Sequence, residues 1–483
     1  MRADPGHIAT SVAAGVMSPC ALVEAYWNAS WVDETSYFVS GSGASQIVPP
    51  GQGLLGMGTA GGASCTLTMS NIDGRYSRLH AGSQAALYGI YGKQIRVSLG
   101  YMYGATPETV RVFTGRIVGV TEQESDGRAE LQCADVSSAV AQQKLSSPMY
   151  MNQRTDEWIE TLAGLAGISG HTLERGHAVI PYCYLDNDFA WDEIRRVAMA
   201  EGGVAFFDAD GALRFWKAAH WCGVASVATY NLATFAELTP ESDYDDVYNQ
   251  VGVEYQPRLQ GPVSSVYQLE RPLLVGPGAS RTVTLRFSLP LVSFFGYTLH
   301  ASSSGGVDMS SLVSVDPVVP DAAGSWTVTL ANSHPYYEAI VGALEVWGWP
   351  LQGRPAEEYV EDQSGSDVPR RRDVRGNWNV QTEEQARLIA PMMATRLKDL
   401  RPSFTLHDMP GNPLLELGDI VTVTGATRTG VSSKTALLGG MRWTYGTGGY
   451  VMTMNLHDFT DFYVHTNYFK VGTSVLNSGR LFY

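Results

Sequence analysis

The sequence predicts a mainly β protein with a smaller α/β part, divided into several domains. Its 483 residues are too many for one average domain and indicate two to four. Charged residues make up only 17% of the chain, whereas there are 51 glycines and 24 tyrosines. Few charges combined with many turn-forming and aromatic residues are typical of short strands joined by tight turns.

The first segment, about residues 20–145, predicts a small barrel or sandwich. In several runs every second residue is apolar, so that each run has one buried face and one solvent-exposed face. These runs are Cys65–Met69, Ile95–Leu99, Val110–Phe113 and Glu130–Cys133. Turn signals such as Asp73-Gly74 and Asp126-Gly127 separate the runs. The stretch Ser40–Gly62 is rich in Gly, Ser and Pro and predicts a loop or arm.

The second segment, about residues 146–222, predicts a small α/β unit. Thr155 is a capping residue followed by two acids, which favours the start of a helix that Gly167 ends. A second helix is expected over Ala190–Glu201, with Gly202-Gly203 as its stop. A hairpin is then expected between Val204–Phe207 and Leu213–Trp216.

The third segment predicts strands, then an exposed connector. The expected strands are Val247–Tyr255, Arg281–Phe287 and Ser325–Leu330. In the connector, acids between Glu357 and Asp362 are followed by the arginines of Arg370–Arg375. The sequence leaves open whether these arginines contact a partner or only water.

The last segment predicts one long helix and three more strands. Thr382 and Gln385 have the spacing of a capping box, and Pro391 predicts a kink or a break inside the helix. The expected strands are Ile420–Thr424, Lys434–Leu438 and Tyr450–Leu456. The stretch Asn467–Tyr483 is expected to be a docking arm or a frayed tail.

The charge and the cysteines exclude several classes of protein. A net charge of −15 argues against gripping nucleic acid, although an acidic surface would let DNA slide past. The cysteines are Cys20, Cys65, Cys133, Cys183 and Cys222. Their odd number and wide spacing favour buried free thiols in a reducing cell. No window of about 18 residues is apolar enough for membrane insertion, and we expect no secretory signal.

Glycine-rich and turn-like motifs have structural explanations. Gly51-x-Gly53-x-x-Gly56 follows two prolines, and a flexible loop is favoured over a dinucleotide site. Tyr91-Gly92-Lys93 is interpreted as a strand turn rather than a phosphate loop. Asp208 and Asp210 are expected to build a hairpin turn rather than a calcium site.

The remaining polar clusters do not indicate an active site. An acidic cluster, in which adjacent carboxylates are more often solvated than catalytic, comprises Glu241, Asp243, Asp245 and Asp246. His171 and His177 are interpreted as surface residues. We therefore expect no catalytic, cofactor-binding or metal-binding residues, no cofactor and no enzymatic activity.

Several stretches, taken in order, resemble the tail-hub family of tailed bacteriophages, which includes baseplate hubs and tail-tip hubs. The matching stretches are Leu67–Gly74, Arg111–Ile117, Leu131–Asp135, Ala200–Phe215 and Gly411–Val423. The resemblance is weaker over residues 1–60, 261–370 and 466–483. The order and spacing of the stretches carry the resemblance, because each stretch alone is a common pattern.

The resemblance implies a structural virion protein that forms a homotrimer around a channel. Two β-barrel-like domains per chain would mimic the six-fold tail tube. The expected parts are a hub domain with an N-terminal arm (1–145), an α/β domain (146–225), a second hub domain (226–260 and 376–465), a β insertion with the charged connector (261–375) and a C-terminal arm (466–483).

The resemblance also implies partners and a place. The partners would be the tail tube or distal tail ring and other tail-tip or baseplate proteins, with genomic DNA passing through without specific binding. The protein would be assembled in the bacterial cytoplasm and lie at the virion tail tip.

Two alternative functions stay open. One is a receptor- or carbohydrate-binding β protein, suggested by 11 tryptophans. The other is a cell-wall hydrolase that would use Glu241, Asp243 or Asp245.

Overall fold

The computed structural model describes most of the chain. The described residues are 2–14, 18–48, 61–221, 224–231, 238–241, 247–365, 367–398, 403–426 and 431–458. Some features named from the sequence lie outside them, namely the Gly51–Gly56 motif, Cys222, the acids Asp243–Asp246 and the arm from Asn467 to Tyr483.

The predicted fold class is confirmed, and one 13-stranded sheet dominates the molecule. The early part of the chain contributes β1 (Pro19–Trp27), β2 (Ser30–Asp33), β3 (Phe38–Gln46), β4 (Ser64–Ser70), β5 (Gln94–Tyr103), β6 (Thr106–Gln123) and β7 (Arg128–Ala134). Later parts contribute β15 (Ala228–Asn231), β16 (Leu238–Glu241), β28 (Ser403–Pro410), β29 (Ile420–Ala426), β30 (Val431–Gly446) and β31 (Gly449–Asp458). Short helices α1 (Ile8–Ala14) and α2 (Gln84–Tyr88) flank the early strands.

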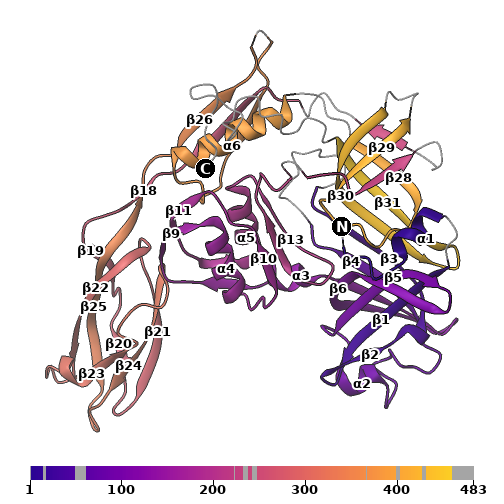
Figure 1. Cartoon of the computed structure of the whole chain (residues 1–483). Helices are drawn as coiled ribbons and strands as arrows, with labels where there is room; N and C mark the ends of the chain where they lie inside the picture. The colour runs from indigo at the N-terminus through magenta and orange to yellow at the C-terminus, as the bar shows by residue number, and fades with distance from the viewer. Residues whose placement is uncertain are drawn as a thin grey trace.

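The early and late strands form two halves that meet at one seam. Along the path β16-β28-β31-β30-β3-β4-β7-β6-β5-β1-β2, antiparallel pairing of β3 with β30 joins the halves, with Gly41 opposite Tyr445 and Gln46 opposite Gly440. The two halves lie one above the other in Figure 1, the late half yellow and the early half indigo. Two sets of strands far apart in the sequence therefore share one hydrogen-bonded sheet.

The expectation of a loop or arm over Ser40–Gly62 is wrong for its first part, because Ser40–Gln46 belongs to β3. Glycine and serine have low strand propensity, so the local signal is weak. The small residues are required by packing instead. A Cβ atom at Gly43 would lie 2.5 Å from the Trp443 ring, and one at Gly41 would lie 2.8 Å from the Leu67 side chain.

The α/β unit lies in the middle of the molecule. It contains α3 (Val136–Val140), α4 (Thr155–Leu165), α5 (Ala190–Met199), β8 (Lys144–Ser146), β9 (Tyr150–Arg154), β10 (His171–Leu173), β11 (Val179–Cys183), β12 (Asp186–Phe189), β13 (Val204–Phe207) and β14 (Leu213–Trp216). The β13–β14 hairpin has the predicted bounds. The cap prediction is wrong, since the N-cap of α4 is Arg154 and the Thr155 hydroxyl instead donates to buried Glu201.

The predicted exposed connector contains two strands of a sheet, which the prediction did not include. Antiparallel β26 (Glu357–Asp362) and parallel β27 (Arg371–Val374) both pair with β17 (Gln250–Tyr255). Most of their charged side chains are exposed, and the two signs neutralise each other across the sheet, as Arg371 of β27 does with Glu358 of β26. The charges hid the strand pattern, because adjacent charged residues leave no alternation of apolar and polar positions.

Helix α6 (Glu383–Leu397) packs against β17 and β26. The predicted capping box is confirmed, with the Thr382 hydroxyl accepting from the Gln385 backbone N–H at 3.2 Å. The helix continues through Pro391, so no break occurs there. Burial of Ile389, Ala390 and Ala394 against β17 holds the helix together across the proline.

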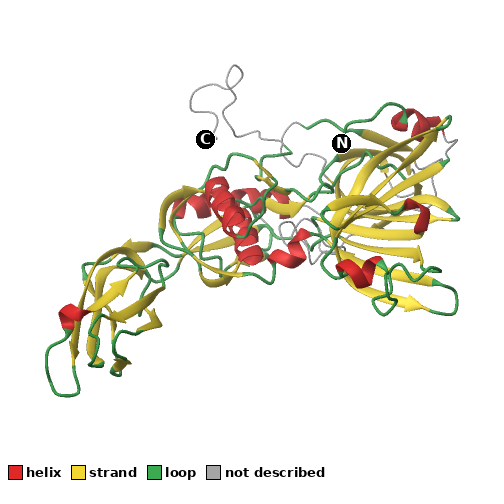
Figure 2. Cartoon of the chain, turned by 90° about the horizontal axis from the view of Figure 1, so that it is seen from below, coloured by secondary structure: helices red, strands yellow, loops and turns green. Residues whose placement is uncertain are grey.

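A two-layer β sandwich occupies the far end of the molecule from the large sheet (Figure 2). One layer contains β18 (Arg258–Gln260), β19 (Ser264–Gln268), β20 (Leu273–Val275), β22 (Leu291–Ser302) and β25 (Ala339–Gly353). The other contains β21 (Ser280–Arg286), β23 (Val313–Asp316) and β24 (Ser325–Asn332). Trp326, Val328 and Leu330 fill the space between the layers.

Candidate functional site

The seam between the two halves of the large sheet has a shared apolar core. Leu414, Trp443 and Tyr450 from the late half are buried in the same cluster as the early strands. The Tyr101 hydroxyl donates to the Gly411 carbonyl across the seam, and burial raises the pKa of Tyr450. Buried aromatic residues and cross-seam hydrogen bonds therefore fix the two halves relative to each other.

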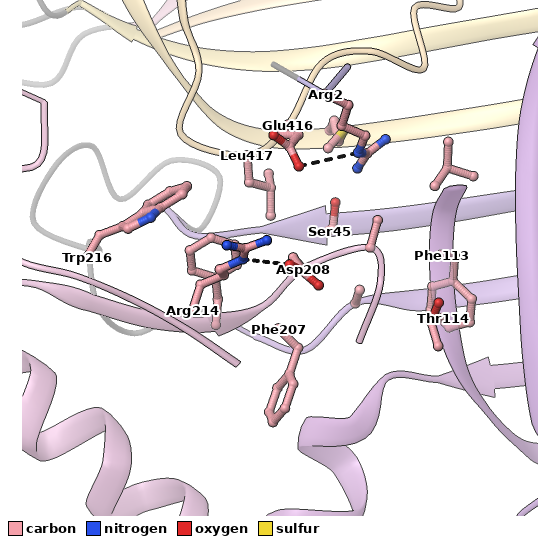
Figure 3. Close-up of a pocket in the computed structure, with 15 residues that line it drawn as sticks. Arg2, Ser45, Phe113, Thr114, Phe207, Asp208, Arg214, Trp216, Glu416 and Leu417 are labelled. Atoms are coloured by element: carbon pink, nitrogen blue, oxygen red, sulfur yellow. Dashed lines mark hydrogen bonds and ion pairs between the residues drawn. The ribbon is translucent and has the colours of Figure 1, made fainter. Parts of the chain in front are cut away.

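A cavity of about 130 Å³ opens where the seam meets the α/β unit. Figure 3 shows its walls, which come from β3, β6, the β13–β14 hairpin and the Glu416–Leu417 turn. Two ion pairs border it: Arg214 with Asp208 at 2.6 Å, and Arg2 with Glu416 at 3.5 Å.

The charged groups around the cavity have structural roles. Asp208 Oδ1 accepts from the Asp210 and Ala212 backbone N–H groups, which confirms the predicted turn. The Arg2 guanidinium donates to the Pro413 carbonyl at 2.7 Å. The four charged side chains that line the cavity are therefore paired with one another or with backbone groups. We interpret it as a junction between parts of the chain.

The α/β unit is held on the late half by aromatic packing. The Trp221 indole N–H donates to the Gly418 carbonyl at 2.9 Å. Trp216 packs on Gly418, whose φ of 83° favours glycine and where a Cβ atom would collide with the ring. Trp216 also stacks on His220 at 4.3 Å. These contacts position the α/β unit against the seam.

A buried carboxylate, Glu193, links α5 to the segment before α6. It accepts from the Asn379 amide at 2.9 Å and from the Trp378 indole at 3.0 Å, with Arg196 at 3.5 Å. Burial raises the pKa of the Glu193 carboxyl to about 7. Raised carboxyl pKa values occur in active sites, but among the described residues Glu193 bonds to Asn379, Trp378 and Arg196, and it lies away from the cavity.

A second buried carboxylate, Glu34, anchors the segment 71–93 to the early half. Glu34 accepts two bonds from the Arg75 guanidinium at 2.7 and 2.6 Å and one each from the Tyr76 hydroxyl and the Trp27 indole. Burial beside this carboxylate raises the pKa of Tyr76. Arg75 and Tyr76 therefore point toward Glu34 and the early half, whereas other residues of the segment expose large apolar side chains to solvent.

We call residues 71–93 the apolar lobe. Leu79 is 100% exposed, Ile72 is 85% exposed and Leu87 is 60% exposed. Arg78 lies over the Tyr91 ring at 5.3 Å. A rigidly anchored segment that exposes several large apolar side chains is typical of a surface covered by another protein. Sequence reasoning missed this surface, because exposure depends on which side chains the tertiary fold leaves outside.

The other candidates from the sequence are placed as follows. His171 and His177 are exposed, and Tyr91-Gly92 lies in a turn before β5, as predicted. Cys20, Cys65, Cys133 and Cys183 are free thiols, with Cys65 opposite Cys133 on neighbouring strands. Glu241 ends β16. In the part of the chain that the structure describes, no group of three or more His, Cys, Asp or Glu side chains could hold a metal ion. Its helices are too short or too polar to cross a membrane.

This architecture is similar to the folds of two solved tail proteins. The tail protein from Neisseria meningitidis MC58 aligns with 91% of this chain and 97% of its own, with a TM-score of 0.50 and 12% identity. The 43 kDa tail protein of prophage MuSo2 from Shewanella oneidensis aligns over 91% and 98%, with a TM-score of 0.51 and 10% identity. A scan against protein-family models and a search of curated proteins find no match. The likeness confirms the fold that the sequence motifs indicate.

Proposed function

We propose that the chain is a structural protein of a phage tail, a hub that joins the tail tube to the tail tip or baseplate. The observation that carries this proposal is the 13-stranded sheet with two halves in one chain. Three such chains would place six sheet halves around one axis. A three-fold assembly of this chain could in this way match a six-fold ring. The fold shared with tail proteins over nearly the whole chain supports this function.

The two ends of the large sheet support self-association. β2 ends the strand order on one side and β16 ends it on the other, while β15 pairs with β29 on a side branch. The helix α2 of the apolar lobe lies beside β2 (Figure 1). A contact between unlike ends repeats head to tail, and it forms a ring when the rotation between neighbouring chains closes.

The charge of the chain supports a role in DNA passage. With a net charge of −15, the assembled ring would repel the phosphate backbone rather than bind it. The protein would be assembled in the bacterial cytoplasm and act at the tail tip without enzymatic activity. The paired charges around the junction cavity agree with a structural role.

Native mass tests the proposal. We expect the purified chain to have a mass near three times 52.3 kDa by light scattering, and imaging to show a central channel. The double substitution Leu79→Ser and Leu87→Ser should shift the protein to a monomer, because it removes exposed apolar area from the closing contact. The matched control is Val368→Ser, which changes a strongly exposed residue outside the lobe.

Two outcomes would contradict different parts of this proposal. A chain that stays monomeric at every concentration, and also fails to form rings on isolated tail tubes, contradicts the hub itself. A trimer that the double substitution leaves intact contradicts only the use of the apolar lobe.

A further inference from the structure

Three loops meet at the outer end of the β sandwich, which we call the distal tip. The strand register brings them together: Val275 lies opposite Ala339, Ser302 opposite Ile340, and Val313 opposite Asn332. The loops that leave or enter these strand ends are residues 276–279, 303–309 and 333–338. They are rich in Gly, Ser and Tyr, a composition found in loops that recognise ligands from a rigid β scaffold.

The loop 333–338 presents two neighbouring tyrosines to solvent. Tyr336 is 82% exposed and Tyr337 is 60% exposed. The His334 ring contacts both, with its centroid 6.4 Å from that of Tyr336 and 4.8 Å from that of Tyr337, and the rest of each tyrosine ring is open to solvent. Such exposed flat faces stack well on the C–H face of a sugar ring, and their hydroxyls still form hydrogen bonds.

The backbone of this loop is held in one conformation. His334 Nδ1 accepts from the backbone N–H groups of Tyr336 and Tyr337, at 3.2 and 2.9 Å. Buried Asn332 donates to the carbonyls of Val275, Gly276 and Tyr337. A platform ordered before binding loses little conformational entropy when a ligand arrives.

The neighbouring loop is also closed by its own hydrogen bonds. Buried Ser303 accepts from the Val307 N–H through its hydroxyl at 3.1 Å and donates its own N–H to the Val307 carbonyl at 2.8 Å. The Asp308 carboxylate, at the end of this turn, accepts from the Ser310 N–H at 2.9 Å. The bonds from Ser310 lower the pKa of Asp308, so this group is an ionised acceptor at neutral pH.

The charges of the distal tip select the class of ligand. The three loops contain Asp308 and Glu338 and no lysine or arginine. Carboxylates accept hydrogen bonds from hydroxyl groups but repel phosphate, sulfate and carboxylate groups. Anionic polysaccharides, nucleic acids and phosphate-rich lipid headgroups are therefore disfavoured. Aromatic faces beside hydroxyl acceptors favour a neutral sugar.

We propose that the distal tip is a binding site for an uncharged saccharide, with the rings of Tyr336 and Tyr337 as the stacking surface and Asp308 and Glu338 as hydroxyl acceptors. This site would give the molecule a contact with a cell-surface glycan at the end farthest from the large sheet (Figure 2). It does not depend on the hub proposal, because the distal tip shares no residue with the sheet ends.

The test uses the full chain and a panel of glycans. The panel contains neutral oligosaccharides of glucose, galactose, mannose and N-acetylglucosamine, with sialylated, sulfated and phosphorylated versions of the same compounds. We expect binding to at least one neutral compound and weaker binding to its charged versions. Titration calorimetry should then show that Tyr336→Ala or Tyr337→Ala lowers affinity by roughly tenfold, whereas Tyr336→Phe retains most of it.

The matched control is Phe295→Ala, which removes another exposed aromatic side chain of the same sandwich away from the three loops. It should leave affinity unchanged. Because the tyrosine side chains are outside the core, the variants should fold, and circular dichroism checks this. Binding to none of the neutral compounds would overturn the proposal. So would a preference for the charged versions, or binding that both tyrosine substitutions leave intact.

Discussion

At the scale of single residues, Glu193 has an unusual arrangement of partners. Its carboxylate accepts from Asn379 and Trp378, while the Asn379 side-chain oxygen is buried without a hydrogen-bond partner among the described residues. A proton on Glu193 would give that oxygen a donor after a rotation of the amide. Burial disfavours the charged form, and the protonated form therefore suits this site.

This arrangement predicts a pH dependence of stability. The folded state raises the pKa of Glu193 to about 7 from its ordinary value of 4.5, so its contribution to stability is full below pH 4.5 and is lost as the pH rises through 7. Glu193→Gln carries no charge. Its free energy of unfolding relative to wild type should therefore rise by up to about 3 kcal/mol between pH 4.5 and pH 8.

Chemical denaturation at a series of pH values measures this difference. Glu124→Gln, a change of an exposed carboxylate, is the control and should leave the wild-type profile unaltered. Parallel profiles for Glu193→Gln and wild type would show that Glu193 does not titrate in this range.

At the scale of elements, the sequence predicts local features well. The β13–β14 hairpin has the expected bounds, because apolar alternation and an Asp-Gly turn are both local. The capping box before α6 was also visible. In contrast, β3 was missed, since the need for its glycines arises from Trp443, about 400 residues later in the chain. The strands β26 and β27 were missed because charged residues mask their pattern.

The candidate surfaces show the same difference between local features, which the sequence predicts, and features that depend on the tertiary fold. The apolar lobe and the distal tip could not be found from the sequence, because Leu79 and Tyr336 look like ordinary core residues until the fold leaves them outside. The domain boundaries expected from the sequence stay a prediction. The structure places β17 with β26 and β27 rather than in the large sheet.

The seam strand gives a prediction at this scale. Gly43→Ala puts a methyl group 2.5 Å from the Trp443 ring and should lower the free energy of unfolding by about 1–3 kcal/mol. Gly448→Ala is the matched control, since nothing lies within 4 Å of its Cβ position. Hydrogen exchange over β3 and β30 should rise in the first variant only. Equal exchange in both variants would mean that the seam tolerates a side chain at this position.

At the scale of the whole molecule, the β sandwich is an insertion whose two ends leave the rest of the chain at the same place. The chain leaves the sheet of β17, β26 and β27 after Tyr255 and returns to it at Glu357, and these two residues lie opposite each other in the β17–β26 pair. The sandwich has its own core, and one of its links to the α/β unit is the hydrogen bond from the Ala323 N–H to the Ser147 carbonyl at 2.8 Å.

This connection predicts that the sandwich can be removed. Replacement of residues 258–353 by a short Gly/Ser linker should leave the remaining protein folded and with the native mass of the full chain, because both ends of the deletion are already adjacent. Binding of neutral saccharides should disappear. Light scattering and the glycan panel measure the two effects. Loss of self-association would contradict the division of roles between the large sheet and the sandwich.

The adjacent ends of this insertion also affect how such a protein can evolve. Recombination that exchanges everything between Tyr255 and Glu357 would deliver a different domain to the same paired strands without altering the register of the large sheet. Under the hub and saccharide proposals above, host preference would then shift in one genetic event while assembly continues. The same attachment point would also accept a chosen binding domain by design.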